Sequence, residues 1–176
     1  MSGANGSSMV RSLLRMIVGV FAAAGATGAA RARDVVAFSA GAAPGTIIVK
    51  TSERRLYFVI GDGIALRYPI AVGRAARQWF GRVSITGKHL QPAWSPPEDL
   101  RRENPDVPDV IPGGAPNNPM GVAALTLSGG DYAIHGTNRP GSIGTFASYG
   151  CIRMYNEDIA HLFTRVNVGT PVVVAR

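Results

Sequence analysis

Short apolar segments separated by turn residues fill most of the chain, and this pattern constrains the fold more than any other feature of the sequence. Each segment has the length of a β-strand, and glycine, proline, asparagine or aspartate bounds most of them. The expected strands cover residues 46–50, 55–60, 64–72, 83–87, 122–127, 132–134 and 171–174. With 22 glycines and 12 prolines among 176 residues, the chain favours many turns and few long helices.

One amphipathic helix is expected near the C-terminus. Asn156 begins it, because the Asn side chain can cap free amide groups and the acidic residues that follow suit the positive end of a helix. Asn167 and Gly169 end it. Its apolar face has the i, i+3, i+4, i+7 spacing and consists of Ile159, Leu162, Phe163 and Val166.

A proline-rich segment, residues 92–119, holds eight of the twelve prolines and one short helical stretch, 98–103. A loop of this length in a compact domain is usually functional or mobile, and we predict a lid or wall over a substrate groove. The alternative is a surface loop without a functional role. The whole pattern predicts a mainly β single domain, a sandwich or a closed sheet, with one or two short helices.

An apolar segment near the N-terminus has the form of a secretory signal peptide. Arg11 and Arg15 precede it, residues 16–26 form its core, and Ala30, Arg31 and Ala32 offer a cleavage site. The core is too short to span a bilayer, since a spanning helix needs about 20 residues. We therefore expect export, cleavage near residues 31 to 33 and no stable membrane span afterwards. The alternatives are an uncleaved anchor and a buried helix.

The charge of the chain argues against a nucleic-acid surface. Its formal net charge is +7, but Arg11, Arg15 and Arg31 belong to the signal segment, which leaves 15 basic against 11 acidic residues. The remaining cations are scattered and are not interleaved with aromatic residues. We expect no nucleic-acid partner, and instead a mildly basic protein that is attracted to anionic polymers of a cell envelope.

Cys151 is the only cysteine, which excludes an internal disulfide and any zinc site built on several thiolates. His89 and His161 have no ligand spacing to it, so no metal site is expected. His135 ends an apolar strand 16 residues before Cys151 and can take the thiol proton and hold the thiolate as an ion pair.

Two glycines flank this pair. Gly136 and Gly150 let the main chain approach a reacting carbonyl group, and the amides near Gly150 and Cys151 can face a developing oxyanion. Spacing alone leaves an alternative open, in which Cys151 is a small buried apolar residue and His135 a hydrogen-bonded structural one.

These residues lie in a stretch that resembles the L,D-transpeptidase catalytic (YkuD-type) signature. The chain reads HGT at 135–137 and SYGCIRM at 148–154, where that signature has a His, a loop of similar length and then S-x-G-C-x-R or S-x-G-C-x-N. Further segments resemble the envelope-enzyme branch of the family, namely 45–49, 56–58, 68–73, 92–97 and 118–121. The resemblance extends over residues 45 to 175.

What the resemblance implies is a periplasmic enzyme that acts on peptidoglycan stem peptides and needs no metal or organic cofactor. By this resemblance Cys151 attacks the carbonyl that joins the third-position diamino acid to a terminal D-alanine, and His135 is the base. The main-chain carbonyl of Gly136 orients the imidazole, where other triads have a carboxylate. An amine of a second stem then resolves the thioester into a 3→3 cross-link, whereas other members use a lipoprotein lysine or a free D-amino acid.

The resemblance also supplies expected substrate contacts. Arg153 is expected to anchor a stem-peptide carboxylate, the alternative being a structural pair with an acid such as Asp158. Ser148 and Tyr149 complete the expected set, although Tyr149 stands where the family often has His. Ser148 and Thr137 are expected as loop hydrogen bonders rather than nucleophiles. Two tryptophans are interpreted as glycan contacts or as packing residues, namely Trp79 and Trp94.

Two other functions stay open at this point. The first is an L,D-carboxypeptidase, in which water replaces the amine, and the second is a wall-binding domain without turnover, against which the presence of both His135 and Cys151 argues. The implied organisation is a signal peptide at 1–32, a short linker at 33–44 and the catalytic domain at 45–175.

Overall fold

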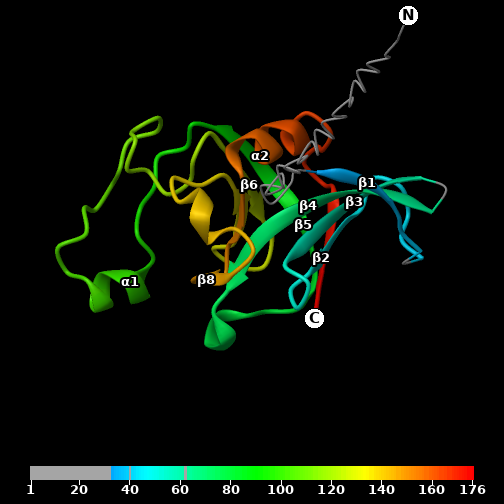
Figure 1. The fold of residues 1–176 in the computed structure, drawn as a ribbon. Helices are drawn as coiled ribbons and strands as arrows, with labels where there is room; N and C mark the ends of the chain where they lie inside the picture. Colours follow the sequence, from blue (N-terminus) through cyan, green and yellow to red (C-terminus); the bar gives the residue numbers. More distant parts are fainter. Residues whose placement is uncertain (1–32, 40, 62) are drawn as a thin grey trace, which may run out of the picture.

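The computed structural model describes residues 33–176 except residues 40 and 62, so the expected signal peptide lies outside the described residues. The strands are β1 (Asp34–Ala37), β2 (Ile47–Lys50), β3 (Arg55–Gly61), β4 (Ile64–Gly73), β5 (Gly81–Leu90), β6 (Ala123–Leu127), β7 (Ala133–His135), β8 (Phe146–Ser148), β9 (Ile152–Met154) and β10 (Pro171–Ala175) (Figure 1). The α-helices are α1 (Glu98–Glu103) and α2 (Asn156–Phe163), and the 3-10 helices are η1 (Ala75–Arg77) and η2 (Pro140–Ser142).

The strands form a sheet that closes on itself. Their order is β4–β3–β2–β10–β5–β6–β7–β9, and β9 pairs back with β4 through Ile70 with Met154 and Ala71 with Arg153. Outside this circuit, β1 and β8 each pair with β4. The predicted mainly β fold with two short helices is confirmed, and of its two forms the closed sheet is the one observed.

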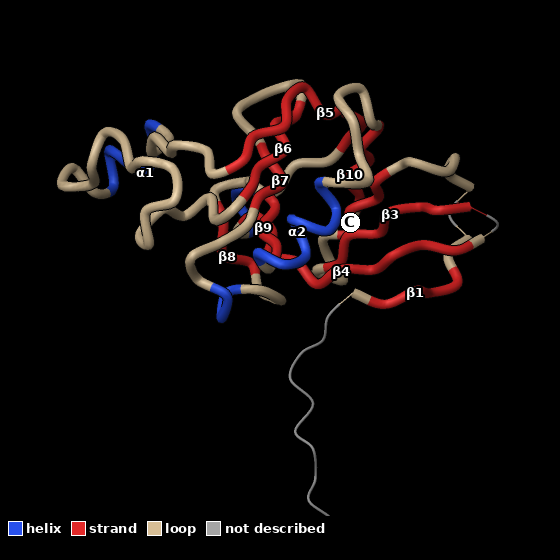
Figure 2. Tube along the Cα trace, turned by 90° about the horizontal axis from the view of Figure 1, so that it is seen from above, coloured by secondary structure: helices blue, strands red, loops and turns tan. Residues whose placement is uncertain are grey.

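The interior of the closed sheet is a single apolar core, because alternate side chains of each strand point inward. In β2, Ile47 and Val49 face this core while Ile48 faces outward. Helix α2 adds fully buried residues to it (Figure 2). The core includes Leu56, Tyr68, Ile70, Leu125, Ile134, Met154, Ile159, Leu162 and Val172.

The predicted apolar face of α2 is confirmed, but both ends of the helix differ from the prediction. The helix ends at Phe163, and Val166 joins the core from the following turn. At the start, Tyr155 occupies the cap position without a side-chain hydrogen bond. The side chain of Asn156 does not cap the helix. It turns instead toward the backbone of Thr137, a contact that no local pattern encodes.

Residues 33–44, expected as a linker, contain strand β1. This strand pairs with β4 in antiparallel register, and Phe38 stacks on Tyr57 with ring centroids 4.4 Å apart. The segment covers the outward side of β2 and β3, where Ile48 and Val59 are buried. It therefore belongs to the folded unit. The prediction missed it because its partner strand supplies the pairing and its own sequence is short and mixed.

The proline-rich segment projects from the body of the protein and carries α1 at its far end (Figure 2). Trp94 and Ile111 exchange two backbone hydrogen bonds at its base, 2.9 and 2.8 Å long. The Asn118 side-chain amide donates to the carbonyl oxygens of Pro92 and Pro112, and both hydrogen bonds are 2.9 Å long. The segment is thus clamped where it leaves the sheet. Within the residues that the structure describes, no helix has the length and apolar character needed to cross a bilayer.

Candidate active site

The parallel pairing of β7 with β9 places the candidate catalytic residues on one face. His135 pairs with Arg153, so Cys151, just before β9, lies beside Ala133. Side chains two residues apart on a strand share a face, and all four of these residues line one cavity. The alternate residues of both strands are buried in the core. The structure therefore brings together His135 and Cys151, as the sequence analysis expects.

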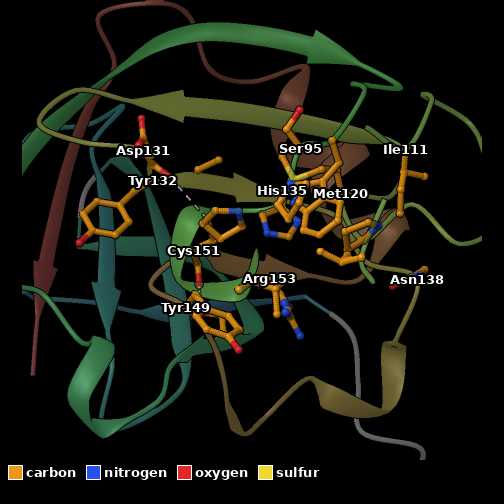
Figure 3. A pocket seen from close by; sticks show the side chains of 18 of the residues that line it. Ser95, Ile111, Met120, Asp131, Tyr132, His135, Asn138, Tyr149, Cys151 and Arg153 are labelled. Atoms are coloured by element: carbon orange, nitrogen blue, oxygen red, sulfur yellow. Dashed lines mark hydrogen bonds between the residues drawn. The ribbon is translucent and has the colours of Figure 1, made fainter. Parts of the chain in front are cut away.

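The cavity has a volume of about 1160 Å³. Figure 3 shows Asp131 and Tyr132 on one side of Cys151, and Arg153 with Tyr149 on the other. The proline-rich segment forms the opposite wall, as predicted, with Trp94, Pro96, Leu100, Val107 and Ile111. The site is consequently a groove between a rigid sheet and a long loop.

His135 is held in one tautomer. Its Nδ1 lies 2.6 Å from the main-chain oxygen of Gly136, and a carbonyl oxygen only accepts, so Nδ1 carries the proton. Nε2 is then the basic nitrogen. Burial, and after it the positive charge of Arg153, lowers the pKa of His135 to about 4. The imidazole is therefore neutral at physiological pH.

Cys151 is half-buried, and its Sγ lies 3.9 Å from the main-chain oxygen of Asp131. Burial raises the pKa of the thiol, although the Ala133 backbone and the charge of Arg153 act in the opposite direction. With a neutral imidazole and a raised thiol pKa, the resting pair is thiol and imidazole. Burial thus acts against the resting ion pair expected from the sequence, because it favours the neutral form of each group.

The loop before Cys151 is internally braced. The Ser148 hydroxyl donates to the main-chain oxygen of Cys151 and accepts from the amide of Gly150 over 3.1 Å. The Ser148 hydroxyl makes hydrogen bonds within the loop, and Ser148 also lines the cavity. The amide of Gly150 already has an acceptor in Ser148, so the Cys151 amide is the more available candidate for an oxyanion donor.

Arg153 lies in the cavity wall with a half-buried side chain. Its Nε is buried without a hydrogen-bond partner, and no acidic side chain of the described residues forms an ion pair with it. Burial lowers the pKa of its guanidinium. Oδ1 of Asp158, the alternative partner, instead lies 3.4 Å from a terminal guanidinium nitrogen of Arg33. The structure thus excludes the Arg153–Asp158 pair and leaves a half-buried cation near Cys151, unpaired within the described part of the chain.

Tyr149 connects the catalytic loop to the proline-rich segment. Its hydroxyl donates to the carboxylate of Glu103 in α1, and the Arg74 guanidinium lies 4.2 Å from its ring centroid. The hydrogen bond to Glu103 raises the pKa of Tyr149. Arg77 also pairs with Asp99 of α1. These contacts hold α1 against the rim of the groove.

Two neighbours of the site, Tyr132 and Asn156, are not predicted as site residues, and Trp79 is predicted only as a glycan contact or a packing residue. Trp79 and Tyr132 stack with centroids 4.7 Å apart beside Gly150, and Asn156 contacts the backbone after His135. No local pattern marks them, because each comes from a different part of the chain. Trp94 lines the cavity. In the part of the chain that the structure describes, no three His, Cys, Asp or Glu side chains cluster as metal ligands.

The chain matches proteins whose names point to one family. The model of the L,D-transpeptidase catalytic domain, YkuD, matches residues 44–174. ErfK/SrfK of Escherichia coli K12, named a probable L,D-transpeptidase, is 39% identical over 137 residues, which cover 73% of this chain and 43% of that protein. YbiS of the same organism, named likewise, is 38% identical over 135 residues, with 72% and 43% covered.

A crystal structure of L,D-transpeptidase 3 from Mycobacterium tuberculosis with a faropenem-derived adduct shares the fold, with a TM-score of 0.57 and 18% identity over 74% of this chain and 60% of that one. The chain spans less than half the length of the two Escherichia coli relatives. The family model covers most of the chain, and His135 and Cys151 line one cavity. This chain belongs to the L,D-transpeptidase catalytic domain family.

Proposed function

We propose that this chain is a cysteine acyltransferase of the cell envelope, an L,D-transpeptidase that acts on peptidoglycan stem peptides. The observation that carries the proposal is the shared face of His135 and Cys151 in one groove, with Nδ1 of His135 fixed on Gly136. This arrangement leaves Nε2 as the base for the only thiol of the chain.

In the acylation step, Nε2 of His135 takes the thiol proton while Sγ of Cys151 attacks the carbonyl carbon before the terminal D-alanine. The oxyanion of the tetrahedral intermediate faces the main-chain amide of Cys151. The C–N bond then breaks, the imidazolium gives its proton to the departing amine, and a thioester remains. Because the resting pair is neutral, the proton moves only when substrate is bound, as general base catalysis requires.

The donor is held by charge. The terminal D-alanine carries a free carboxylate, and the Arg153 guanidinium supplies paired donors in a cavity wall partly shielded from water. The Arg153 guanidinium supports this role, since no acidic side chain of the described residues is paired with it and its charge is available to a ligand.

An amine acceptor then approaches the thioester. Its attack transfers the acyl group to nitrogen, His135 takes the proton that the amine loses, and Sγ leaves as the thiol after that proton returns. Asp131 attracts an acceptor that arrives as an ammonium ion, because its side chain is exposed at the cavity on the side away from Arg153, and the ammonium loses one proton to water before the neutral amine attacks (Figure 3). The acceptor is a second stem peptide, with a lipoprotein lysine as the other amine of this class.

The test is incubation of the purified protein with disaccharide tetrapeptide, followed by mass analysis of protein and products. We expect one acyl group on Cys151, release of D-alanine and a 3→3 linked dimer, all absent with Cys151→Ala. A carbapenem should modify the same thiol. Tripeptide without dimer would identify a carboxypeptidase, and retention of intact substrate by a protein that binds it would identify a wall-binding domain.

The cellular location is a separate part of the proposal. The basic residues, apolar core and small residues of positions 1–32 support a signal peptide that directs residues 45–175, as a catalytic domain, to the periplasm. N-terminal sequencing of the protein from an envelope fraction should begin between residues 31 and 33. A sequence that begins upstream of the apolar core would contradict cleavage.

A further inference from the structure

The peptide group between Gly136 and Thr137 lies between two side chains. On its carbonyl side, Nδ1 of His135 donates to the Gly136 oxygen over 2.6 Å. On its amide side, the Thr137 N–H donates to Oδ1 of Asn156 over 3.0 Å. Because C=O and N–H of one peptide are conjugated, a hydrogen bond at the nitrogen makes the oxygen a better acceptor.

The position of the Asn156 oxygen is dictated by its surroundings. A Cβ atom on Gly121 or on Gly136 would lie 2.2 Å from Oδ1, so two glycines create the space that it occupies. The amide of Val122 lies 3.4 Å from the same oxygen. Asn156 is also the first residue of α2, whose buried residues anchor it to the core. The acceptor is therefore held in place from three directions.

We infer that Asn156 is a positioning residue for the base, and that its amide oxygen fixes the Gly136–Thr137 peptide which in turn orients and supports the His135 imidazole. The inference rests on the proposed function for its catalytic meaning. A carbonyl oxygen is a weaker support for an imidazolium than the carboxylate of other triads. Polarisation of the peptide by Asn156 strengthens that support at the moment when His135 holds the thiol proton.

The imidazolium exists only during turnover, so the contribution of Asn156 falls on the acylation rate and not on donor binding. Arg153 of β9 is the charged side chain that acts on His135, and Cys151, just before β9, lines the same cavity. Both stay unchanged when Asn156 is replaced, which isolates the effect of the peptide.

The test compares Asn156→Ala, Asn156→Asp and a control, Glu157→Gln, which alters an exposed neighbour on the same helix. We expect Asn156→Ala to lower the acylation kcat on the order of 10- to 100-fold with little change in KM, a loss typical of groups that orient an active-site ligand. Asn156→Asp keeps an acceptor oxygen and should recover most of the rate. Glu157→Gln should behave as the parent protein.

Two readouts need no substrate and so separate this inference from the proposed function. The rate of Cys151 alkylation by iodoacetamide against pH should shift in Asn156→Ala and recover in Asn156→Asp. The proton resonance of His135 Nδ1–H, far downfield for a 2.6 Å hydrogen bond, should move upfield in Asn156→Ala. An unshifted resonance and alkylation profile, or equal loss in the Ala and Asp variants, would overturn the inference even if the parent protein forms cross-links.

Discussion

Trp79 donates its indole N–H to the main-chain oxygen of Gly150 over 2.9 Å, so a side chain just before β5 holds the residue that precedes Cys151. Trp79 also stacks on Tyr132, whose ring lies against Gly150 on the face where a Cβ atom would project. Gly150 has a φ of +125°, a conformation that L side chains rarely adopt. Cys151 thus follows a backbone turn that an aromatic pair fixes from outside the loop.

Replacement of Gly150 tests this support. In Gly150→Ala the new Cβ would lie 2.5 Å from the Tyr132 ring, whereas in Gly144→Ala, also at positive φ, it would meet nothing within 4 Å. Both variants share the backbone cost. We expect Gly150→Ala to lower the free energy of unfolding by about 1 to 3 kcal/mol more than Gly144→Ala, the usual cost of overpacking. Urea denaturation measures the difference in unfolding free energy. Equal losses would show that the Trp79–Tyr132 pair moves to accommodate the new methyl group without a cost in stability.

The pH dependence of acylation follows from the neutral resting pair. A base with a pKa lowered to about 4 stays able to accept a proton well below pH 6.5, the ordinary value for histidine. The rate should hold as pH falls toward 5 and decline as it passes through about 4. His135→Ala should acylate about 10² to 10⁴ times more slowly with its fold intact. A decline centred near pH 6.5 would contradict the neutral, buried imidazole.

Most of the strands and the candidate pair were predictable, whereas β1, β8, β9 and the closure of the sheet were not. Apolar runs bounded by turn residues mark β2, β3, β4 and β6 because burial and turn chemistry are local properties. The β4–β9 pairing that closes the sheet joins residues far apart in the chain, and β9 has only three residues. A pattern of three residues is too short to predict a strand from the sequence when the partner strand is unknown.

The same limit applies to the site. His135 and Cys151 stand in a recognisable motif, but the residues that brace them come from elsewhere in the sequence. Asn156 has the sequence context of a helix cap, and only the three-dimensional arrangement turns its oxygen toward Thr137. Trp79 likewise has the sequence context of a packing residue, and only the structure shows its hydrogen bond to Gly150.

Arg153 should discriminate between donors by their charge. Arg153→Lys replaces a forked donor with a point charge, and Arg153→Ala removes the charge. We expect turnover of tetrapeptide donors to fall in that order, by about 1 to 3 kcal/mol of transition-state free energy for the loss of a partly shielded charged hydrogen bond. On a donor with an amidated terminus, the parent protein and Arg153→Ala should perform alike. Equal losses on both donors would indicate that Arg153 stabilises the loop and does not bind the donor carboxylate.

Tyr149 and Glu103 should act as one unit that holds α1 at the rim of the groove. Tyr149→Phe removes the donor of this hydrogen bond, and Glu103→Ala removes its acceptor. Since the contact is largely exposed, each should raise the donor KM less than about fivefold, the worth of a surface pair below 1 kcal/mol, and leave kcat unchanged. The double variant should show no further loss, because both changes delete the same contact. Additive losses would show that the two residues act separately.

Asp158 should make folding stability fall as pH rises. Its side chain is buried, its Oδ2 lacks a hydrogen-bond partner, and Arg33 at 3.4 Å offsets only part of the desolvation. Burial raises the pKa of Asp158 from 3.8 to about 6, so the folded protein binds its proton more tightly than the unfolded chain. The resulting stabilisation is complete below pH 3.8 and is lost as pH rises through about 6.

Asp158→Asn removes this titration and keeps the shape of the side chain. From pH 4 to pH 7, the free energy of unfolding of Asp158→Asn should rise by about 2 to 3 kcal/mol relative to that of the parent protein. The lowered pKa of His135 makes stability fall as pH drops from 6.5 toward 4, but this effect is common to both proteins and cancels in their difference. Asp34→Asn, at an exposed acid paired with Arg67, is the matched control and should show no comparable gain. A difference between Asp158→Asn and the parent that does not vary with pH would mean that Arg33 keeps the Asp158 carboxylate charged throughout.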